Sequence, residues 1–357
     1  NIQSWQECKL CQNSIKANKL KNEHELQSFF NRDIEIFLKT KGKELMGWDE
    51  IVEGGLSESA TMMWWRNWAP KMRDIAANNG NNMIITPCFE YYFDAKHEVT
   101  PFEKVYKYEP IPEGFNAAQT KHILGIQANL WSEWIPNFKR LEYQAFPRLL
   151  AMAETAWTPK EDKDYEDFQV RMNLQYNRLD ALEVKYHIPA VTGFKDKVVF
   201  VDKAIVELQA PLKNMDIYYT TDGSKPSKSS KKYVNPIEFT ETAILNTIAY
   251  RGSISSETKS AVIEKQSYLE PLEINPKVGR IKRWVGVKKF TVVDDIKLPN
   301  KDTFTTVKNI NFTDFEGTEH VSMIFNVYFY VEEEGLYEFA TKSDHGSLLY
   351  IGDKFVV

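Results

Sequence analysis

The chain has 357 residues, of which 43% are hydrophobic and 27% charged, and its formal net charge is −5 at pH 7. These values exclude a disordered or fibrous chain and allow two or three globular domains. The small negative charge gives no long-range attraction for nucleic acid. The only basic cluster, 277–289, is interleaved with Gly, Val and Trp, so we expect a solvated strand face there.

Neither a membrane helix nor a metal site is expected from the sequence. No apolar run approaches the ~20 residues that a membrane span needs, and the first residues, Asn-Ile-Gln-Ser-Trp, do not resemble an export signal. Cys8 and Cys11 form a Cys-x-x-Cys spacing, but Cys88 is the only other cysteine and no His-x-x-x-His follows. Because structural zinc takes four ligands, we expect no metal here.

Residues 1–187 alternate short apolar runs with amphipathic stretches, which predicts parallel strands joined by helical crossovers. The apolar runs are too short for helices, so they are the strand candidates. The predicted strands span 44–48, 60–65, 83–87 and 122–127, and the predicted helices span 25–40, 70–79, 142–157 and 164–182. On the first helix one apolar stripe is formed by Leu26, Phe29, Phe30, Ile34, Phe37 and Leu38.

After a Pro- and Gly-containing segment at 188–194, which we interpret as a linker, the apolar pattern changes to period two. Strands are predicted at 198–208, 216–221 and 243–250 of an antiparallel domain, with Thr221-Asp222-Gly223-Ser224 as a hairpin turn. We expect this domain to serve as a scaffold.

A third region begins at about Glu270 and is again strand-like. Strands are predicted at 323–331, 335–341 and 347–351. The sequence stops at Phe355-Val356-Val357, an apolar strand with nothing after it. Because domains rarely end on an unpaired apolar edge, we interpret this end as a cut.

Aromatic and acidic residues recur at the ends of the four predicted parallel strands, where the loops of a parallel barrel build its active site. Trp48 ends the first run, Trp65 the second, Tyr92 and Asp94 follow the third, and Trp131 and Glu133 follow the fourth. Aromatic faces pack against pyranose rings, and carboxylates accept hydrogen bonds from sugar hydroxyls. One such tryptophan is more often part of a core, so the prediction of a sugar pocket depends on the fourfold recurrence.

In combination, these motifs resemble the second half of a family 20 glycoside hydrolase barrel, that of β-N-acetylhexosaminidases, over nearly all of residues 1–187. The motifs are Glu25–Phe29, Lys43–Glu50, Ala60–Arg66, Tyr92–Asp94, Gly125–Glu133 and Phe146–Trp157.

The resemblance implies an α/β fold with three parts. Residues 1–187 would form strands five to eight of a (β/α)8 TIM barrel. Two small antiparallel β-sandwich domains would follow. Residues 188–267 resemble the sandwich C-terminal to bacterial hexosaminidase barrels, and 268–357 resemble an incomplete PA14-type domain.

The same resemblance implies the site residues. Trp48, Trp65 and Trp131 would wall the subsite of the terminal N-acetylhexosamine. Tyr92 would hydrogen-bond the acetamido oxygen, and Asp94 and Glu133 would hold hydroxyls at the far edge of the sugar.

Family 20 enzymes are retaining exo-glycosidases that use substrate assistance: the 2-acetamido oxygen attacks the anomeric carbon and an oxazolinium ion forms. An Asp that polarises the acetamide and a Glu that acts as general acid stand in a Gly-Gly-Asp-Glu type motif after the family's fourth strand. We expect this sequence to begin just beyond that motif, and therefore expect the chain alone to be inactive.

The adjacent acids Asp49 and Glu50 follow Trp48 at the fifth-strand position, where the family's acids are mainly structural, so we do not assign them catalysis. Arg66 and Arg148 are interpreted as structural, with Glu154 as a helix-borne partner.

In the last region, 343–351 is similar to the start of a PA14-type domain, and some of those domains bind calcium and glycan through an Asp-Asp-Gly loop. His345 replaces the second Asp, so we expect a plain turn.

Two other functions remain open. The chain could be a non-catalytic glycan-binding protein, which an upstream reading frame lacking His-x-Gly-Gly-Asp-Glu would favour. A chitinase-like enzyme is less consistent, because its Asp-x-x-Asp-x-Asp-x-Glu spacing is absent.

The expected ligand is a glycan with a terminal β-linked N-acetylglucosamine or N-acetylgalactosamine, with no cofactor, no nucleic acid and no membrane span. The N-terminal barrel half is expected to be needed as well. We expect the parent protein to be exported, to the periplasm, cell surface or exterior of a bacterium. The oligomeric state and the preferred hexosamine are left open.

Overall fold

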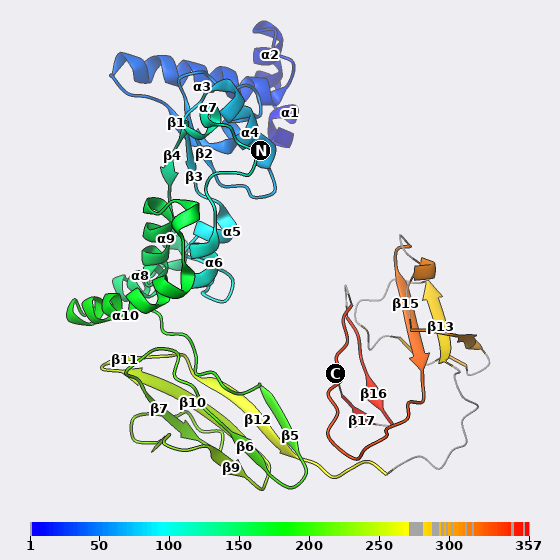
Figure 1. Ribbon diagram of the computed structural model, residues 1–357. Coiled ribbons are helices and arrows are strands. Elements are labelled where there is room, and N and C mark those ends of the chain that lie inside the picture. Colours follow the sequence, from blue (N-terminus) through cyan, green and yellow to red (C-terminus); the bar gives the residue numbers. More distant parts are fainter. Residues whose placement is uncertain are drawn as a thin grey trace.

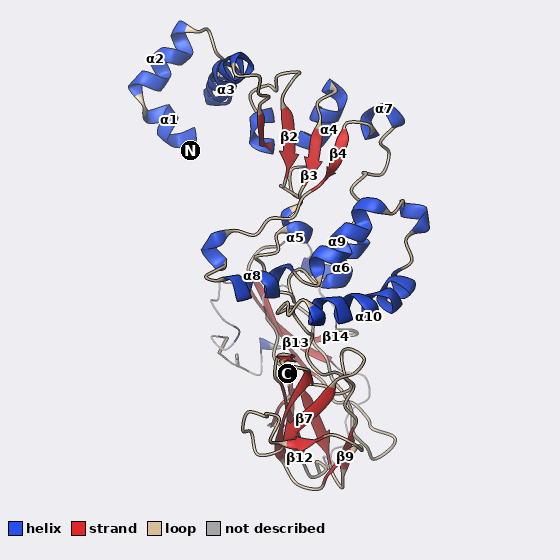
Figure 2. Ribbon diagram, turned by 90° about the vertical axis from the view of Figure 1, so that its left-hand side faces the viewer, coloured by secondary structure: helices blue, strands red, loops and turns tan. Residues whose placement is uncertain are grey.

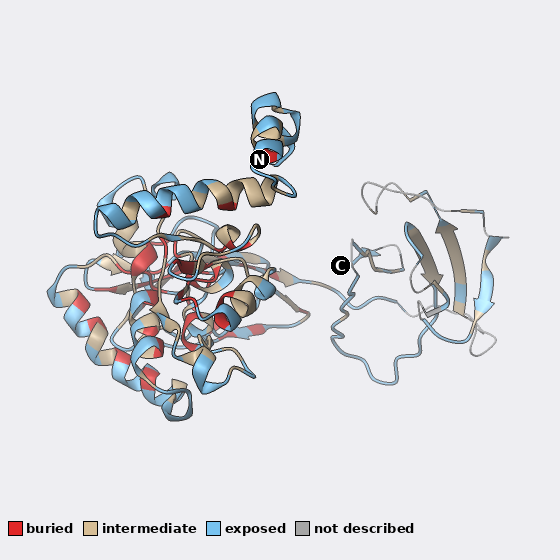
Figure 3. Ribbon diagram, turned by 90° about the horizontal axis from the view of Figure 1, so that it is seen from above, coloured by how far each residue is buried: buried red, intermediate tan, exposed pale blue. Residues whose placement is uncertain are grey.

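The computed structural model describes residues 2–270 and, beyond them, 281–287, 293, 296–297, 299–300, 303–310, 313–315, 318–343, 346–352 and 354–356. Figure 1 shows three bodies in chain order: a region of helices and one sheet, a β-sandwich, and a third region of strands. Buried residues gather in the first two bodies, and none of the described side chains after residue 270 is buried (Figure 3).

The first body contains a four-stranded sheet in the order β1-β2-β3-β4, and every pairing in it is parallel. The strands are β1 Met46–Trp48, β2 Thr61–Trp64, β3 Met83–Ile85 and β4 Ile123–Ile126. Each lies inside a predicted range, so the four parallel strands are confirmed. Among the described residues β1 pairs only with β2 and β4 only with β3, and the two outer strands leave Met46 and Leu124 exposed.

Ten helices accompany the sheet in the described part of this body. They are α1 Ile2–Glu7, α2 Lys9–Ala17, α3 Glu23–Thr40, α4 Pro70–Asn79, α5 Cys88–Tyr91, α6 Phe102–Lys107, α7 Ala117–Thr120, α8 Phe138–Ala145, α9 Arg148–Trp157 and α10 Tyr165–Ala181. Short 3-10 turns occur at η1 Asp49–Val52, η2 Ser132–Trp134, η3 Lys160–Asp162 and, in the third region, η6 Thr313–Phe315. Figure 2 shows α5, α6, α8 and α9 beyond the arrowheads of the strands.

The single helix predicted for 142–157 is wrong, because the chain forms α8 and α9 instead. Phe146 leaves the helical region at φ −104° and ψ 140°. A residue before proline is pushed toward extended geometry, and Pro147 has no N–H to donate to the preceding turn. The two helices are therefore separate.

The helix predicted at 25–40 is confirmed as α3, but its apolar stripe does not face a core among the described residues. Phe30 is 61% exposed and Phe37 56%, whereas Ser28 and Glu35 are buried. Glu35 accepts a hydrogen bond from Ser57 Oγ at 2.8 Å, so this helix contacts the loop after η1 through polar groups. On the apolar stripe, the side chains of Phe30, Ile34 and Phe37 are exposed, and the other three are half-buried.

The segment 188–194 contains no helix or strand, but it is not a free linker. Ile188 is buried in the core of the helices, and Val191 is buried in the core of the sandwich. The segment therefore joins two hydrophobic cores with its own side chains.

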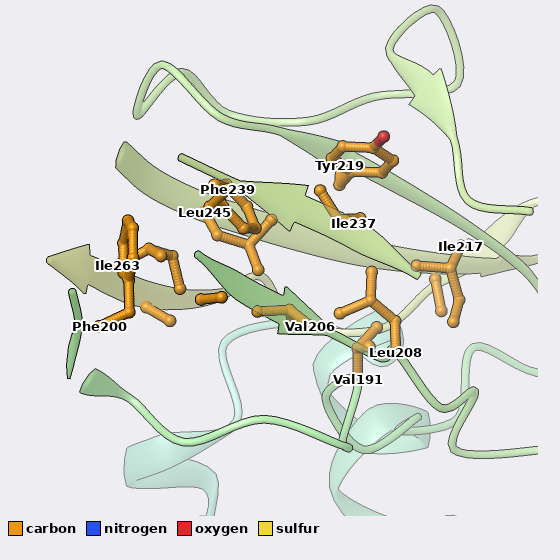
Figure 4. Close-up of a cluster of buried hydrophobic side chains, with 13 residues drawn as sticks. Val191, Phe200, Val206, Leu208, Ile217, Tyr219, Ile237, Phe239, Leu245 and Ile263 are labelled. Atoms are coloured by element: carbon orange, nitrogen blue, oxygen red, sulfur yellow. The ribbon is translucent and has the colours of Figure 1, made fainter. Parts of the chain in front are cut away.

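The second body has a six-stranded sheet in the order β5-β12-β10-β7-β8, with β11 on β10, and a two-stranded sheet β6-β9. Its core includes Phe200, Val206, Ile217, Leu245 and Ile263 (Figure 4). The strands are β5 Lys197–Phe200, β6 Ala204–Val206, β7 Asp216–Thr220, β8 Lys231–Lys232, β9 Ile237–Phe239, β10 Ala243–Arg251, β11 Ile254–Ser255 and β12 Lys259–Lys265.

Three predictions for this body are corrected. The strand predicted at 198–208 is two strands, because a bend at 201–202 carries the chain from one sheet to the other. The domain is not entirely antiparallel, since β5 pairs with β12 in parallel. Asp222 Oδ1 accepts from the Ser224 N–H at 3.0 Å, but β8 begins only at Lys231, so this turn opens a longer connection and not a tight hairpin.

The third body has a three-stranded antiparallel sheet in the order β14-β13-β15 and a two-stranded sheet β16-β17. The strands are β13 Ile281–Val287, β14 Thr305–Val307, β15 Val321–Asn326, β16 Tyr350–Ile351 and β17 Lys354–Phe355. The strand predicted at 335–341 is wrong, because an alternating pattern defines two faces but supplies no pairing partner. The strand predicted at 323–331 is observed as β15, which begins at Val321 and ends at Asn326, and that at 347–351 is shortened to β16. Asp344 and His345 lie outside the described residues.

Arg251 at the end of β10 ties the sandwich to α10. Its Nε lies 2.8 Å from Asp180 Oδ2, and its Nη2 donates to Asn177 Oδ1 at 2.6 Å. Its Nη1 donates to the Lys213 carbonyl at 2.8 Å, so the guanidinium also holds a loop of its own body. This side chain is almost fully enclosed at the contact between the two bodies.

Two buried imidazoles, His97 and His187, are stacked near the junction of the first two bodies. Their ring centroids are 3.7 Å apart at an interplanar angle of 7°, and Tyr143 meets both rings edge-on. Burial lowers the pKa of His97 to about 2 and that of His187 to about 4, and the nearby guanidinium of Arg148 adds to both effects. Both rings are therefore neutral in the folded protein at neutral pH.

We predict that acidification from pH 7 to pH 5 destabilises the fold through His187. In the unfolded chain its pKa is about 6.5, so the unfolded state binds the extra proton and is favoured by roughly 2 kcal/mol at pH 5. Asp49, whose pKa is raised to about 6 by burial, contributes with the opposite sign. Urea unfolding of the wild type and of His187→Phe at both pH values isolates the histidine, because Asp49 is common to both proteins. Equal pH dependence in the two proteins would contradict the prediction.

Candidate functional site

Trp48, Trp65, Tyr92 and Trp131 form a closed circuit of ring contacts, which we call the aromatic cup. The centroid distances are 6.5 Å from Trp48 to Trp65, 6.0 Å from Trp65 to Tyr92, 6.1 Å from Tyr92 to Trp131 and 5.8 Å from Trp131 to Trp48. Trp131 is 42% exposed, so the cup is open to solvent on that side. The structure thus brings together all four aromatic residues that the sequence pattern singled out.

Parallel pairing places these side chains at one edge of the sheet. Trp48 is the last residue of β1, and Trp65 directly follows β2. Beyond the ends of β3 and β4, Tyr92 and Asn129 form one further parallel bridge, in which the Phe93 N–H donates to the Asn129 carbonyl at 2.7 Å. This bridge keeps Tyr92 beside Trp131, two residues after Asn129.

The two acids after Trp48 both hold the loop after β2. Asp49 is fully buried, and its Oδ1 lies 2.6 Å from Arg66 Nε. Burial raises the pKa of Asp49 to about 6 although the guanidinium opposes this shift, so the carboxyl is largely ionised at neutral pH. Glu50 Oε2 accepts a hydrogen bond from Trp65 Nε1 at 3.0 Å, and this contact orients one wall of the cup.

Asp94 and Glu133 are the two carboxyl groups that the sequence pattern assigns to this edge of the sheet, after β3 and β4. Burial raises the pKa of Asp94, and the negative charge of Glu133 adds to the shift while Arg148 opposes it. Within the described part of the chain no donor reaches the buried Asp94 Oδ1. Glu133 is exposed in η2. The pair therefore provides carboxylate oxygens that can accept hydrogen bonds from a ligand.

Tyr92 is a hydrogen-bond donor at this site. Burial raises the pKa of its phenol well above the usual range, and the nearby Cys88 and Asp94 act in the same direction. The phenol therefore stays protonated at any physiological pH, and its O–H can donate a hydrogen bond to an oxygen of a ligand.

Arg148 positions the backbone that carries Asp94. Its guanidinium is fully buried and donates to the carbonyl of Phe93 at 2.5 Å and to that of Ala95 at 3.1 Å. Gln144 adds a bond from Nε2 to the carbonyl of Asp94 at 2.8 Å. Gln144 was missed by the sequence reasoning, and the only signal for it is a polar residue one turn before Arg148.

The partner expected for Arg148 was wrong. Glu154 pairs with Arg171 at 2.5 Å, not with Arg148. Residues six positions apart on a helix do not share a face, whereas those three or four apart do. Arg148 is directed into the core, and Glu154 meets α10.

In the residues that the structure describes, no helix is long and apolar enough to cross a membrane, and no group of three or more His, Cys, Asp or Glu is arranged to hold a metal. Cys8 uses its sulfur to accept from the Cys11 N–H at 3.4 Å, so this spacing forms the N-cap of α2.

Comparison with known proteins gives two family matches. Residues 1–160 match the catalytic domain of glycosyl hydrolase family 20, and residues 199–262 match the chitobiase/β-hexosaminidase C-terminal domain. A β-hexosaminidase of Porphyromonas gingivalis is 36% identical over 95% of this chain and 46% of its own length. A β-hexosaminidase of Vibrio furnissii is 31% identical over 42% of this chain and 26% of its own length.

Among solved structures, the chitobiase of Flavobacterium johnsoniae is 28% identical, with a TM-score of 0.47 over 51% of this chain and 28% of that one. The chain thus spans less than half the length of these relatives.

We predict that Arg148→Met lowers the free energy of unfolding by at least about 3 kcal/mol, because several buried carbonyl groups lose their donor. Urea unfolding measures the change. The control is Arg171→Met: Arg171 is a half-exposed surface arginine with two ion-pair partners, for which a loss below about 1 kcal/mol is expected. Similar losses for the two variants would show that the buried guanidinium is not the stabilising group.

Proposed function

Because this chain belongs to glycosyl hydrolase family 20, we propose that its aromatic cup holds the terminal sugar in a retaining exo-β-N-acetylhexosaminidase. The observation that carries the proposal is the closed circuit of Trp48, Trp65, Tyr92 and Trp131 at the carboxyl edge of the sheet. Indole faces supply apolar walls for the sugar and its acetamido methyl, and the carboxylates Asp94 and Glu133 accept hydrogen bonds from its hydroxyls.

Tyr92 is the residue we propose to act in the chemical step. Its protonated phenol would donate to the acetamido oxygen and hold it beneath the anomeric carbon. The acetamido oxygen then forms a bond to the anomeric carbon while the glycosidic bond breaks, and the leaving oxygen takes the proton of the general acid. Water would then attack the anomeric carbon from the opposite side, lose a proton to the conjugate base of that acid and break the bond to the acetamido oxygen, so the β-configuration is retained.

The general acid and the acetamide-polarising Asp would come from residues outside this sequence. Asp49 is paired with Arg66, and Glu50 accepts from Trp65 Nε1, so both acids hold the loop after β2 and we assign neither as the proton donor. The outer strands β1 and β4 are each paired on one side only within the described residues, as expected if further strands complete a (β/α)8 barrel. The proposed substrate is a glycan with a terminal β-linked N-acetylglucosamine or N-acetylgalactosamine, and we propose that the complete protein is exported to reach it.

We predict that the purified chain does not hydrolyse 4-nitrophenyl N-acetyl-β-D-glucosaminide, because it lacks the proton donor. Release of nitrophenolate is followed at high protein concentration. Turnover that disappears in Glu50→Gln or Asp49→Asn would place the acid in this chain and contradict the assignment.

We predict that Trp131→Ala weakens binding of N-acetylglucosamine by about 2 kcal/mol, roughly thirtyfold, as for loss of a stacked aromatic anchor. Nuclear magnetic resonance titration of the chain measures the affinity. Trp157→Ala, which changes an 89% exposed tryptophan at the end of α9, is the matched control and should bind as the wild type does. Unchanged affinity in Trp131→Ala would remove this residue from the pocket.

A further inference from the structure

Cys8 and Cys11 are a pair of thiols at the start of α2 that the proposed function does not use. Both side chains are partly exposed, and both carry free thiols in this structure. Figure 2 shows α1 and α2 separated from the parallel sheet by α3. The pair is therefore open to solvent and lies apart from the aromatic cup.

The backbone at the start of α2 brings the two thiols together. Cys8 is the N-cap, with φ −81° and ψ 111°, and its carbonyl accepts from the Gln12 N–H at 3.0 Å. Its Sγ accepts from the Cys11 N–H at 3.4 Å, and the two thiols are also hydrogen-bonded to one another. An N-cap side chain that turns back over the third helical residue is the geometry of a helix cap.

This geometry suits a disulfide between the two residues. On a helix, residues three positions apart have Cα atoms about 5 Å apart, within the range of about 4.4 to 6.8 Å that a disulfide spans. Inside a helix the Cβ atoms of such a pair are about 5–6 Å apart, too far for the ~3.8 Å that the bond needs. The extended backbone of Cys8 removes this obstacle, so the pair can close by rotation of its side chains.

The turn that carries the thiols is held by its neighbours. Gln12 Nε2 donates to the Trp5 carbonyl at 3.0 Å and to Glu23 Oε1 at 2.9 Å. One side chain thus joins α1, α2 and α3 directly beside Cys11. The two thiols are therefore kept close by folded structure and not only by their spacing in the sequence.

The three cysteines of the chain differ in reactivity. Hydrogen bonds from the Cys11 thiol and N–H lower the pKa of the Cys8 thiol, and the same thiol contact raises the pKa of Cys11. Because the thiolate is the nucleophile, Cys8 is the thiol that attacks first. Burial raises the pKa of Cys88, whose Sγ lies 3.6 Å from Asn67 Oδ1. Cys88 is thus an internal comparison for an unreactive thiol.

We propose that Cys8 and Cys11 form a redox-active dithiol whose oxidant is a small disulfide of the glutathione class. The Cys8 thiolate attacks one sulfur of the oxidant, and a mixed disulfide forms as one glutathione thiolate leaves. Cys11 loses its proton to solvent, attacks Cys8 Sγ and displaces the second glutathione thiolate. Two protein thiols thereby lose two electrons and two protons and form one S–S bond, and the oxidant is reduced to two thiols. The inference is independent of the proposed function.

The first test treats the full chain with mixtures of reduced and oxidised glutathione. Acid stops the exchange, N-ethylmaleimide labels the remaining thiols of the denatured chain, and trypsin cleaves it. Lys9 lies between the two cysteines, so a disulfide joins the fragments 1–9 and 10–16. We expect oxidised glutathione to give this joined pair, which a reductant separates, while Cys88 keeps its label. Labels on both fragments in every mixture, or disulfides between chains only, would overturn the proposal.

The second test assigns the attacking thiol with two matched variants. Cys11→Ser should accumulate a mixed disulfide of Cys8 with glutathione about tenfold faster than Cys8→Ser accumulates one at Cys11. Serine is a favoured N-cap residue, so Cys8→Ser keeps the start of α2. In urea, where the helix is unfolded, the two rates should become equal. Equal rates in the folded variants, or a difference that persists in urea, would overturn the assigned geometry.

Discussion

Parallel pairing of β1 to β4 is the constraint on which the site depends. Strands that run in the same direction end at the same edge, so Trp48 and Trp131, far apart in sequence, come into ring contact. The strands themselves are only three or four residues long. Their short pairing is extended by the bridge between Tyr92 and Asn129, which carries the parallel register past the last regular hydrogen bonds and into the loops.

A second layer of polar contacts then fixes how the aromatic residues are oriented. Glu50 holds the indole of Trp65, and the ion pair of Arg66 with the buried Asp49 fixes the loop that follows. Arg148 does the same for the backbone around Asp94. Burying a charge is costly unless the charged group is paired or hydrogen-bonded. Here the partners of the buried charges lie in loops, so each contact holds a loop in one conformation. The aromatic residues and the loops beside them are thus held in place by polar contacts of the chain itself.

The sequence predicted the four parallel strands and the aromatic residues at their ends, because short apolar runs and the residues after them are local signals. It failed where tertiary contacts decide. The break between α8 and α9 is an exception, because Pro147 is itself a local signal. The prediction of one helix followed the continuous apolar pattern instead of the proline. In α3 the side chain of Glu35 is buried, whereas those of Phe30 and Phe37 are exposed. Which face of this helix is buried depends on the loop that meets it. Gln144 donates to the carbonyl of Asp94, and the carbonyl of Asn129 accepts from the Phe93 N–H. Both roles depend on backbone groups far away in the chain, which no local pattern specifies.

The contact made by Arg251 has a consequence for engineering. Its guanidinium reaches Asp180 and Asn177 on α10, and Ile188 and Val191 continue the apolar packing from one body into the next. The β-sandwich is for this reason no interchangeable module. A chimaera that replaces residues 199–262 with the equivalent piece of a relative would remove the cationic partner of Asp180 at the end of α10, unless an arginine is grafted with it at the matching place.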